Sequence, residues 1–188
     1  GESGCGKTTA SLLLMAALRK RGLDVAPCKV GPDYIDTGFH ELVCGRAGHN
    51  LDSFLIEPRD LPTLLSRPAD ITVIEGVMGY YDGIGLDSSR ASTFEVAQRT
   101  ESPVVLVLNA KGAGLSVLAV LDGFLHFATE NRIRGVHQLM QRLGEKPRLY
   151  SGVLCGYLAL AAVEGVVCTP LDHRLIASPA QHQLHAVS

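Results

Sequence analysis

The sequence predicts an α/β fold built on a doubly wound, mostly parallel sheet. Short apolar segments alternate with segments of helical periodicity over most of the chain, an order that is typical of βαβ units. Polar residues follow the apolar segments directly, and ligands bind such sheets beyond the carboxyl ends of the strands. A glycine-rich stretch at the N-terminus leads straight into a helical pattern.

The glycine-rich stretch reads GESGCGKTT and fits the phosphate-binding pattern G-x-x-x-x-G-K-[ST]. Its glycines let the backbone curl so that successive N–H groups point at one anion. Lys7 is placed to reach the β- and γ-phosphates, and the Thr8 hydroxyl to bind Mg²⁺. The motif therefore predicts ATP binding by these residues: Gly1, Ser3, Gly4, Cys5, Gly6, Lys7, Thr8 and Thr9.

A phosphate-binding loop of this kind follows a β-strand, whereas Gly1 is the first residue here. We therefore expect the first strand of the sheet to be missing. A fragment, a truncated gene product and a mispredicted start all fit this expectation. The predicted fold class is thus a P-loop NTPase with an incomplete sheet.

The composition narrows the class of protein. A length of 188 residues with 46% apolar and 19% charged residues suits one globular α/β domain. A net charge of −2 and the absence of Trp speak against a nucleic-acid partner. The sequence shows neither a signal-peptide pattern nor an apolar run long enough to cross a bilayer. We expect a cytoplasmic protein without a membrane partner, whose cysteines are reduced.

Periodicity predicts helices over residues 9–21, 60–66, 93–99 and 115–128, and apolar runs predict strands over residues 24–30, 71–75 and 103–108. Pro27 cannot donate a ladder hydrogen bond, so its strand is expected at an edge or at a bulge. Residues 37–50 have no clear pattern. The two histidines there, His40 and His49, are interpreted as structural.

The pattern weakens from Gly135 onward. Gly135-Val136 begins like a strand, but residues 137–140 do not continue it. We expect one domain over residues 1–135 and a tail over residues 136–188 without an assignable element. Out-of-register translation or an unrelated extension would produce such a tail.

Three acidic segments lie at strand ends. The strand over residues 71–75 ends in Glu75, the Walker B arrangement that delivers one carboxylate to Mg²⁺. The loop over residues 31–36 follows the preceding strand, and its composition fits a solvated turn as well as a ligand-binding loop. Asp82 stands in the glycine-rich loop after Glu75, which fits either a ligand site or a flexible connection.

Four segments together resemble the synthetase domain of cobyrinate a,c-diamide synthase and of the related hydrogenobyrinate enzyme: the P-loop with its helix, residues 29–36, residues 50–53 and residues 75–83. The resemblance covers residues 1 to about 135 and implies a fold similar to that of dethiobiotin synthetase. It implies amidation of the a and c carboxylates of a corrin ring in cobalamin synthesis. The reaction in this family uses ATP, Mg²⁺ and ammonia drawn from glutamine.

The resemblance also implies how the residues divide the work. A carboxylate must be activated before ammonia can displace its oxygen, and attack on the γ-phosphate gives an acyl phosphate that ammonia then opens. Oxygen ligands suit Mg²⁺, and the resemblance assigns them to Thr8, Asp52 and Glu75. The positions near the activated carboxylate, where catalytic roles are expected, are Asp33, Tyr34, Asp36 and Asp82.

The sequence departs from the pattern of this family in three respects. The first strand is expected to be missing, and the strand expected near Gly135 is broken. We also expect this chain to lack the C-terminal glutaminase domain of the family, with its nucleophilic cysteine and histidine. The expected partners are therefore a corrinoid substrate and either free ammonia or glutamine handled by the missing domain. A homodimer is one candidate assembly.

Three other interpretations compete with this one. A dethiobiotin-synthetase-like ligase would act on a smaller substrate, although the loops at residues 31–36 and 75–83 speak against it. Partition and septum-positioning ATPases carry a signature lysine five residues before the loop lysine, where this chain has Glu2. An inactive remnant with an incomplete sheet is the third alternative.

Overall fold

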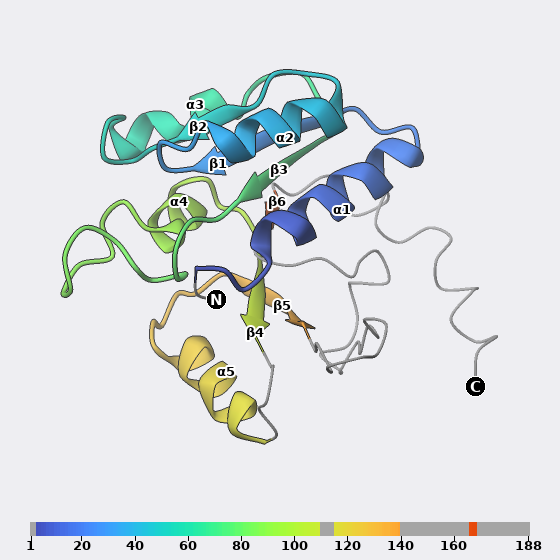
Figure 1. Ribbon diagram of the computed structural model, residues 1–188. Helices are drawn as coiled ribbons and strands as arrows, with labels where there is room; N and C mark the ends of the chain where they lie inside the picture. Colours follow the sequence, from blue (N-terminus) through green and yellow to red (C-terminus); the bar gives the residue numbers. More distant parts are fainter. Residues whose placement is uncertain (1–2, 110–114, 140–165, 169–188) are drawn as a thin grey trace, which may run out of the picture.

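The structure is a computed structural model that describes residues 3–109, 115–139 and 166–168. Figure 1 shows helices set around a central sheet. In chain order the elements are α1 (Lys7–Lys20), β1 (Val25–Val30), α2 (Ile35–Cys44), β2 (His49–Leu51), the 3-10 helix η1 (Pro58–Asp60), α3 (Leu61–Leu64), β3 (Ile71–Glu75), α4 (Thr93–Arg99), β4 (Val104–Asn109), α5 (Ser116–His126), β5 (Ile133–Leu139) and β6 (Val166–Cys168).

The six described strands form one sheet in the order β2-β1-β3-β6-β4-β5. β1 runs parallel to both β2 and β3, and β4 runs parallel to β5. β6 lies between β3 and β4 and is antiparallel to both. The predicted α/β fold with a mostly parallel sheet is confirmed.

Helices cover both faces of this sheet because strand side chains alternate between the faces. On one face, Leu14, Met15 and Leu18 of α1 pack against Val25 of β1 and Val73 of β3. Each such buried side chain contributes roughly 1.5–3 kcal/mol. The opposite face carries the larger cluster, in which residues of α3, α4 and α5 pack against the following strand residues: Cys28, Val30, Ile74, Leu106 and Leu108.

Most predicted elements form close to their predicted bounds. α4 is an example: the Ser92 hydroxyl accepts a hydrogen bond from the backbone N–H of Glu95 at 3.1 Å, as its sequence predicts. The Glu95 carboxylate accepts in return from the backbone N–H of Ala91 at 2.7 Å. These reciprocal bonds satisfy backbone donors at the start of the helix.

The prediction that Pro27 places its strand at an edge or a bulge is wrong. β1 is an internal strand, paired on one side with β3, where Pro27 lies opposite Val73. On the other side the short strand β2 pairs only with residues 28–30. Pro27 lies beyond the reach of β2, so the missing N–H does not interrupt that ladder.

Several elements extend the predicted architecture, among them α2, β2 and β5. α2 forms in the segment that showed no clear pattern. β5 continues through Leu139, which pairs with Asn109, so the prediction of a broken strand after Val136 is wrong. β5 lies at the edge of the sheet, beside β4.

The remaining tail prediction concerns mostly residues outside the described part of the chain. Within the described part of the tail, residues 166–168 form β6, a strand of the sheet that the sequence did not predict. Three cysteines, Cys5, Cys28 and Cys44, are buried and free of disulfides. No helix in the described ranges combines the length and the apolar character that crossing a membrane requires.

Candidate nucleotide site

The phosphate-binding motif forms a loop whose backbone only glycine adopts readily. Gly4 has φ of 76° and Gly6 has φ of 94°, both in the left-handed region that disfavours other residues. α1 begins immediately after Gly6, so its unpaired N–H groups and positive dipole end lie at the loop. Ser3 and Gly4 are exposed. The predicted Gly1 contribution lies outside the described residues.

The loop is attached to the sheet through Cys5. This side chain is buried, and its thiol donates to the carbonyl oxygen of Val107 in β4 at 3.9 Å. The Lys7 ammonium lies 3.9 Å from the Cys5 sulfur. Cys5 therefore fills the space beneath the loop and holds it against β4. Thr9, also predicted to bind nucleotide, is exposed on α1.

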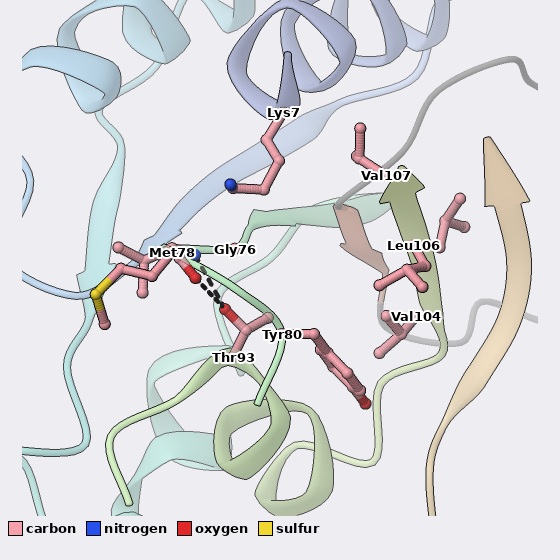
Figure 2. A pocket seen from close by; sticks show the side chains of 10 residues that line it. Lys7, Gly76, Met78, Tyr80, Thr93, Val104, Leu106 and Val107 are labelled. Carbon is pink, nitrogen blue, oxygen red and sulfur yellow. Dashed lines mark hydrogen bonds between the residues drawn. The ribbon is translucent and has the colours of Figure 1, made fainter. Parts of the chain in front are cut away.

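Lys7 lines a cavity between the loop that follows β3 and the strand β4. Figure 2 shows its side chain extending from α1 toward the backbone at Gly76 and Met78, with apolar side chains of β4 on the other side. The Thr93 hydroxyl holds this loop by accepting from the Val77 N–H at 2.9 Å and donating to the Val77 carbonyl at 3.2 Å. The wall of the cavity opposite β4 is thus a fixed stretch of backbone.

A buried polar network lies beside this cavity, on the face of the sheet that α1 and α2 cover. Lys29 and Glu75 face each other in the parallel register of β1 and β3. Lys29 follows Val25 by four residues in β1, and Glu75 follows Val73 by two residues in β3, so each shares a face of the sheet with a residue packed under α1. Strand alternation therefore points both charged side chains toward the first turns of the two helices.

The contacts within this network are short. The Lys29 ammonium donates to Glu75 Oε1 at 2.8 Å, to Asp36 Oδ2 at 2.7 Å and to the Gly76 carbonyl at 3.3 Å. The Thr8 hydroxyl donates to Glu75 Oε1 at 2.7 Å and lies 3.3 Å from Asp36 Oδ2. The cluster thus draws one side chain from each of four parts of the chain: the P-loop motif, β1, α2 and β3.

The charges in the network stabilise each other. Burial by itself would lower the pKa of Lys29, but the neighbouring Glu75 and Asp36 carboxylates outweigh burial and raise it. Burial by itself would raise the pKa of Glu75, but hydrogen bonds from His40, Lys29 and Thr8 and the Lys29 charge together lower it. Glu75 is therefore held as a carboxylate and Lys29 as an ammonium.

The loop over residues 31–36 positions Asp36 through the start of α2. Asp33 Oδ1 accepts from the backbone N–H groups of Ile35 at 2.9 Å and Asp36 at 3.0 Å. Asp33 thus caps the helix, and the helix carries Asp36 to Lys29 and Thr8. Tyr34 lies between them in sequence but is 84% exposed.

Two predicted site residues lie apart from the network. Asp52 is buried after β2, and its carboxylate accepts from the Phe54 N–H at 2.9 Å. Asp82 is exposed in the loop after β3, and its carboxylate accepts from the Gly79 N–H at 2.9 Å. Within the described part of the chain no hydrogen bond joins either residue to Thr8 or Glu75.

The network has the oxygen ligands that a hard divalent cation prefers. It offers the Thr8 hydroxyl beside the carboxylates of Asp36 and Glu75. One lysine charge opposes two carboxylate charges, so the cluster retains net negative charge. No group of three or more His, Cys, Asp or Glu side chains in the described ranges forms a metal site by itself. A cation here would therefore need the hydroxyl and nucleotide oxygens as further ligands.

Two residues of the network, His40 and Lys29, are not among the predicted site residues. His40 Nε2 lies 2.6 Å from Glu75 Oε2, and both residues are fully buried. Lys29 entered the sequence-based resemblance only as the first residue of the segment at residues 29–36. A lysine inside an apolar strand signals a buried partner, because unpaired buried charges are rare. His40 carries no comparable signal without knowledge of α2.

Taken together, the sheet, the glycine loop before α1 and the acidic tip of β3 define a P-loop nucleotide-binding fold. The chain belongs to the CobQ/CobB/MinD/ParA nucleotide binding domain family, whose model matches residues 1–155.

Curated relatives carry more specific names. The chain is 50% identical over 139 residues to a cobyrinate a,c-diamide synthase of Listeria innocua, a match that covers 72% of this chain and 31% of the relative. A cobyrinate a,c-diamide synthase of Salmonella typhimurium is 49% identical over 71% of this chain and 30% of its own length. A hydrogenobyrinate a,c-diamide synthase of Streptomyces coelicolor is 50% identical over 72% of this chain and 28% of its own length.

The resemblance predicted from the sequence is confirmed by these relatives. The chain matches only 28–31% of the length of these three relatives. No solved structure gave a match.

Proposed function

We propose that this chain supplies the ATP-handling part of a cobyrinate or hydrogenobyrinate a,c-diamide synthase. The observation that carries the proposal is the convergence of Thr8, Asp36 and Glu75 around Lys29, directly beside the phosphate-binding loop. The names of the relatives supply the substrate class, since each is named for the diamidation of a corrinoid.

In this proposal ATP lies along the P-loop. Backbone N–H groups around Gly4 and Gly6, together with the start of α1, bind the phosphate oxygens. Lys7 neutralises the β- and γ-phosphates from the adjoining cavity. Mg²⁺ would be held by Thr8 and Glu75, and it would offset the charge of the phosphates during transfer. The contribution of Asp52 to this site stays a prediction.

The reaction begins with the carboxylate of the corrinoid. One carboxylate oxygen attacks the γ-phosphorus and the bond to the bridging β–γ oxygen breaks, which releases ADP and leaves an acyl phosphate. Ammonia then attacks the acyl carbon and phosphate leaves, giving the amide. The protein contributes position and charge compensation, because the chemistry needs no covalent enzyme intermediate.

The loop residues are proposed to act on the substrate side. Asp33 holds the start of α2 and so positions Asp36. Tyr34 and Asp82 are exposed next to the site-forming elements and can contact a large substrate or accept the proton of ammonia. Ammonia would come from solution or from glutamine through a glutaminase domain of the whole protein. We propose that the protein acts in the cytoplasm.

Substrate-dependent ATP turnover tests the proposal. ADP formation is measured with the chain, Mg²⁺ and ammonium chloride in the presence of cobyrinate, of hydrogenobyrinate or of a diamine substrate of the dethiobiotin synthetase type. We expect stimulation by a corrinoid and none by the diamine. Stimulation by the diamine alone would favour the smaller-substrate ligase.

A second measurement addresses the inactive-remnant alternative. Ligands that bind only the folded state raise its unfolding midpoint. We expect ATP with Mg²⁺ to raise the midpoint of a cooperative unfolding transition. If the chain unfolds without cooperativity and ATP with Mg²⁺ does not raise its midpoint, the chain is an inactive remnant.

A further inference from the structure

His40 is a buried histidine that the proposed chemistry does not use. It lies on α2 one helical turn after Asp36, so both side chains point to the same side of the helix. Its Nε2 lies 2.6 Å from Glu75 Oε2, and neither side chain is exposed to solvent. The same helix face thus carries two groups to the Lys29–Glu75 pair.

The two oxygens of Glu75 have separate partners. Oε1 accepts from Lys29 at 2.8 Å and from Thr8 at 2.7 Å. Oε2 accepts from His40, which is the hydrogen bond found for that oxygen among the described residues. A carboxylate held at both ends cannot rotate about its terminal bond without losing one of these contacts.

The other ring nitrogen shows that packing alone does not explain the histidine. His40 Nδ1 is buried and has no hydrogen-bond partner within the described part of the chain. An ionised carboxylate oxygen can only accept, so Nε2 carries the proton of this contact, and Nδ1 is left without a hydrogen-bond partner. An unsatisfied buried polar atom costs about 1–3 kcal/mol, which a leucine filling the same space would avoid.

We propose that His40 is a positioning residue that fixes the Glu75 carboxylate so that Oε1 faces the Thr8 hydroxyl. The inference rests on the proposed function, which places Mg²⁺ between these two groups. Partners that hold a metal-binding carboxylate in place typically change metal affinity by about 10- to 100-fold. His40 therefore acts on Mg²⁺ binding through Glu75, without touching nucleotide or substrate.

The test measures how much Mg²⁺ strengthens nucleotide binding. Fluorescent mant-ATP is titrated into the chain with Mg²⁺ and again with EDTA, and the ratio of the two dissociation constants gives the Mg²⁺-dependent gain. The variants are His40→Leu, which removes the donor, and His40→Gln, whose amide nitrogen reaches about as far as Nε2. His126→Leu on exposed α5 is the matched control.

We expect His40→Leu to lower the Mg²⁺-dependent gain by about ten-fold or more, with the affinity measured in EDTA unchanged. His40→Gln should restore most of the gain, and His126→Leu should equal the parent chain. A merely structural histidine would instead weaken binding equally with and without Mg²⁺. Should His40→Leu not fold, His40→Asn replaces it, because asparagine keeps a polar group but is too short to reach Glu75.

A full Mg²⁺-dependent gain in folded His40→Leu, or in His40→Asn if that variant replaces it, would overturn the inference. Absence of any gain in the parent chain is a different result. It would show that the chain lacks the proposed Mg²⁺ site, and it would overturn the proposed function together with this inference.

Discussion

Lys29 Nζ lies 2.8 Å from Glu75 Oε1, in a pair that is almost completely excluded from solvent and that joins neighbouring parallel strands. The pair brings opposite charges together at the point where β3 meets the loop that lines the nucleotide cavity. Removing one partner of a buried pair is far more damaging than its net contribution suggests, because the other charge is left uncompensated.

Lys29→Met should therefore destabilise the fold strongly. The change removes the ammonium that Glu75 and Asp36 share, and we expect the free energy of unfolding to fall by roughly 3–5 kcal/mol. Urea denaturation at neutral pH measures this difference. Lys20→Met, at the exposed end of α1, is the control and should change stability little. A loss similar to that of the control would show that the pair does not stabilise the fold as we propose.

The lowered pKa of Glu75 predicts a loss of stability in acid. Burial raises that pKa, but the His40, Lys29 and Thr8 contacts lower it below its ordinary value of 4.5. A group whose folded pKa lies below its unfolded pKa stabilises the fold fully above the unfolded value. That contribution is lost as the pH falls through the folded pKa.

Unfolding in urea between neutral pH and about pH 3 measures this contribution. Glu75→Gln should be less stable than the parent at neutral pH and should show a smaller decrease on acidification. Glu41→Gln, an exposed change on α2, should follow the parent curve. Parallel curves for the parent and Glu75→Gln would refute the assignment.

Gly76 is the glycine at which the loop after β3 passes closest to Thr93. A Cβ at this position would lie 2.9 Å from both Cγ2 and Oγ1 of Thr93, so the hydroxyl that anchors Val77 would have to move. We expect Gly76→Ala to lower the free energy of unfolding by about 1–3 kcal/mol and to weaken nucleotide binding.

Gly123 on α5 offers the matched control, since a Cβ there meets no atom within 4 Å. In a helix, alanine is favoured over glycine by about 0.5–1 kcal/mol, so Gly123→Ala should be neutral or stabilising. Equal effects of the two changes would mean that the Gly76 loop relaxes freely around Thr93.

The sequence predicted well those elements whose inner side is apolar. β3 and β4 are uninterrupted apolar runs, and α1 and α4 have regular periodicity with recognisable ends. α2 has the reverse pattern: its buried residues are His40 and Cys44, while Phe39 and Leu42 are exposed. A helix that covers a polar site gives no apolar stripe toward the core, so periodicity does not reveal it.

The candidate site was predictable to a similar degree. Thr8 and Glu75 follow from short motifs with a known geometry, whereas the contacts of Lys29 and His40 depend on strand register and on the existence of α2. Register is a property of tertiary structure, and a shift of one residue would turn Lys29 to the other face of the sheet. The sequence lists these residues without indicating that they meet.

The central claim is that the glycine loop and Lys7 bind the triphosphate of ATP. Equilibrium titration of ATP with Mg²⁺ into the parent chain, Lys7→Ala and the control Lys20→Ala tests it most directly. We predict saturable binding by the parent and by Lys20→Ala. In Lys7→Ala we expect the affinity to be lower by about ten-fold or more, because one charge-assisted contact to the phosphates is lost. Equal affinity in folded Lys7→Ala, or no binding by the folded parent chain, would contradict the account.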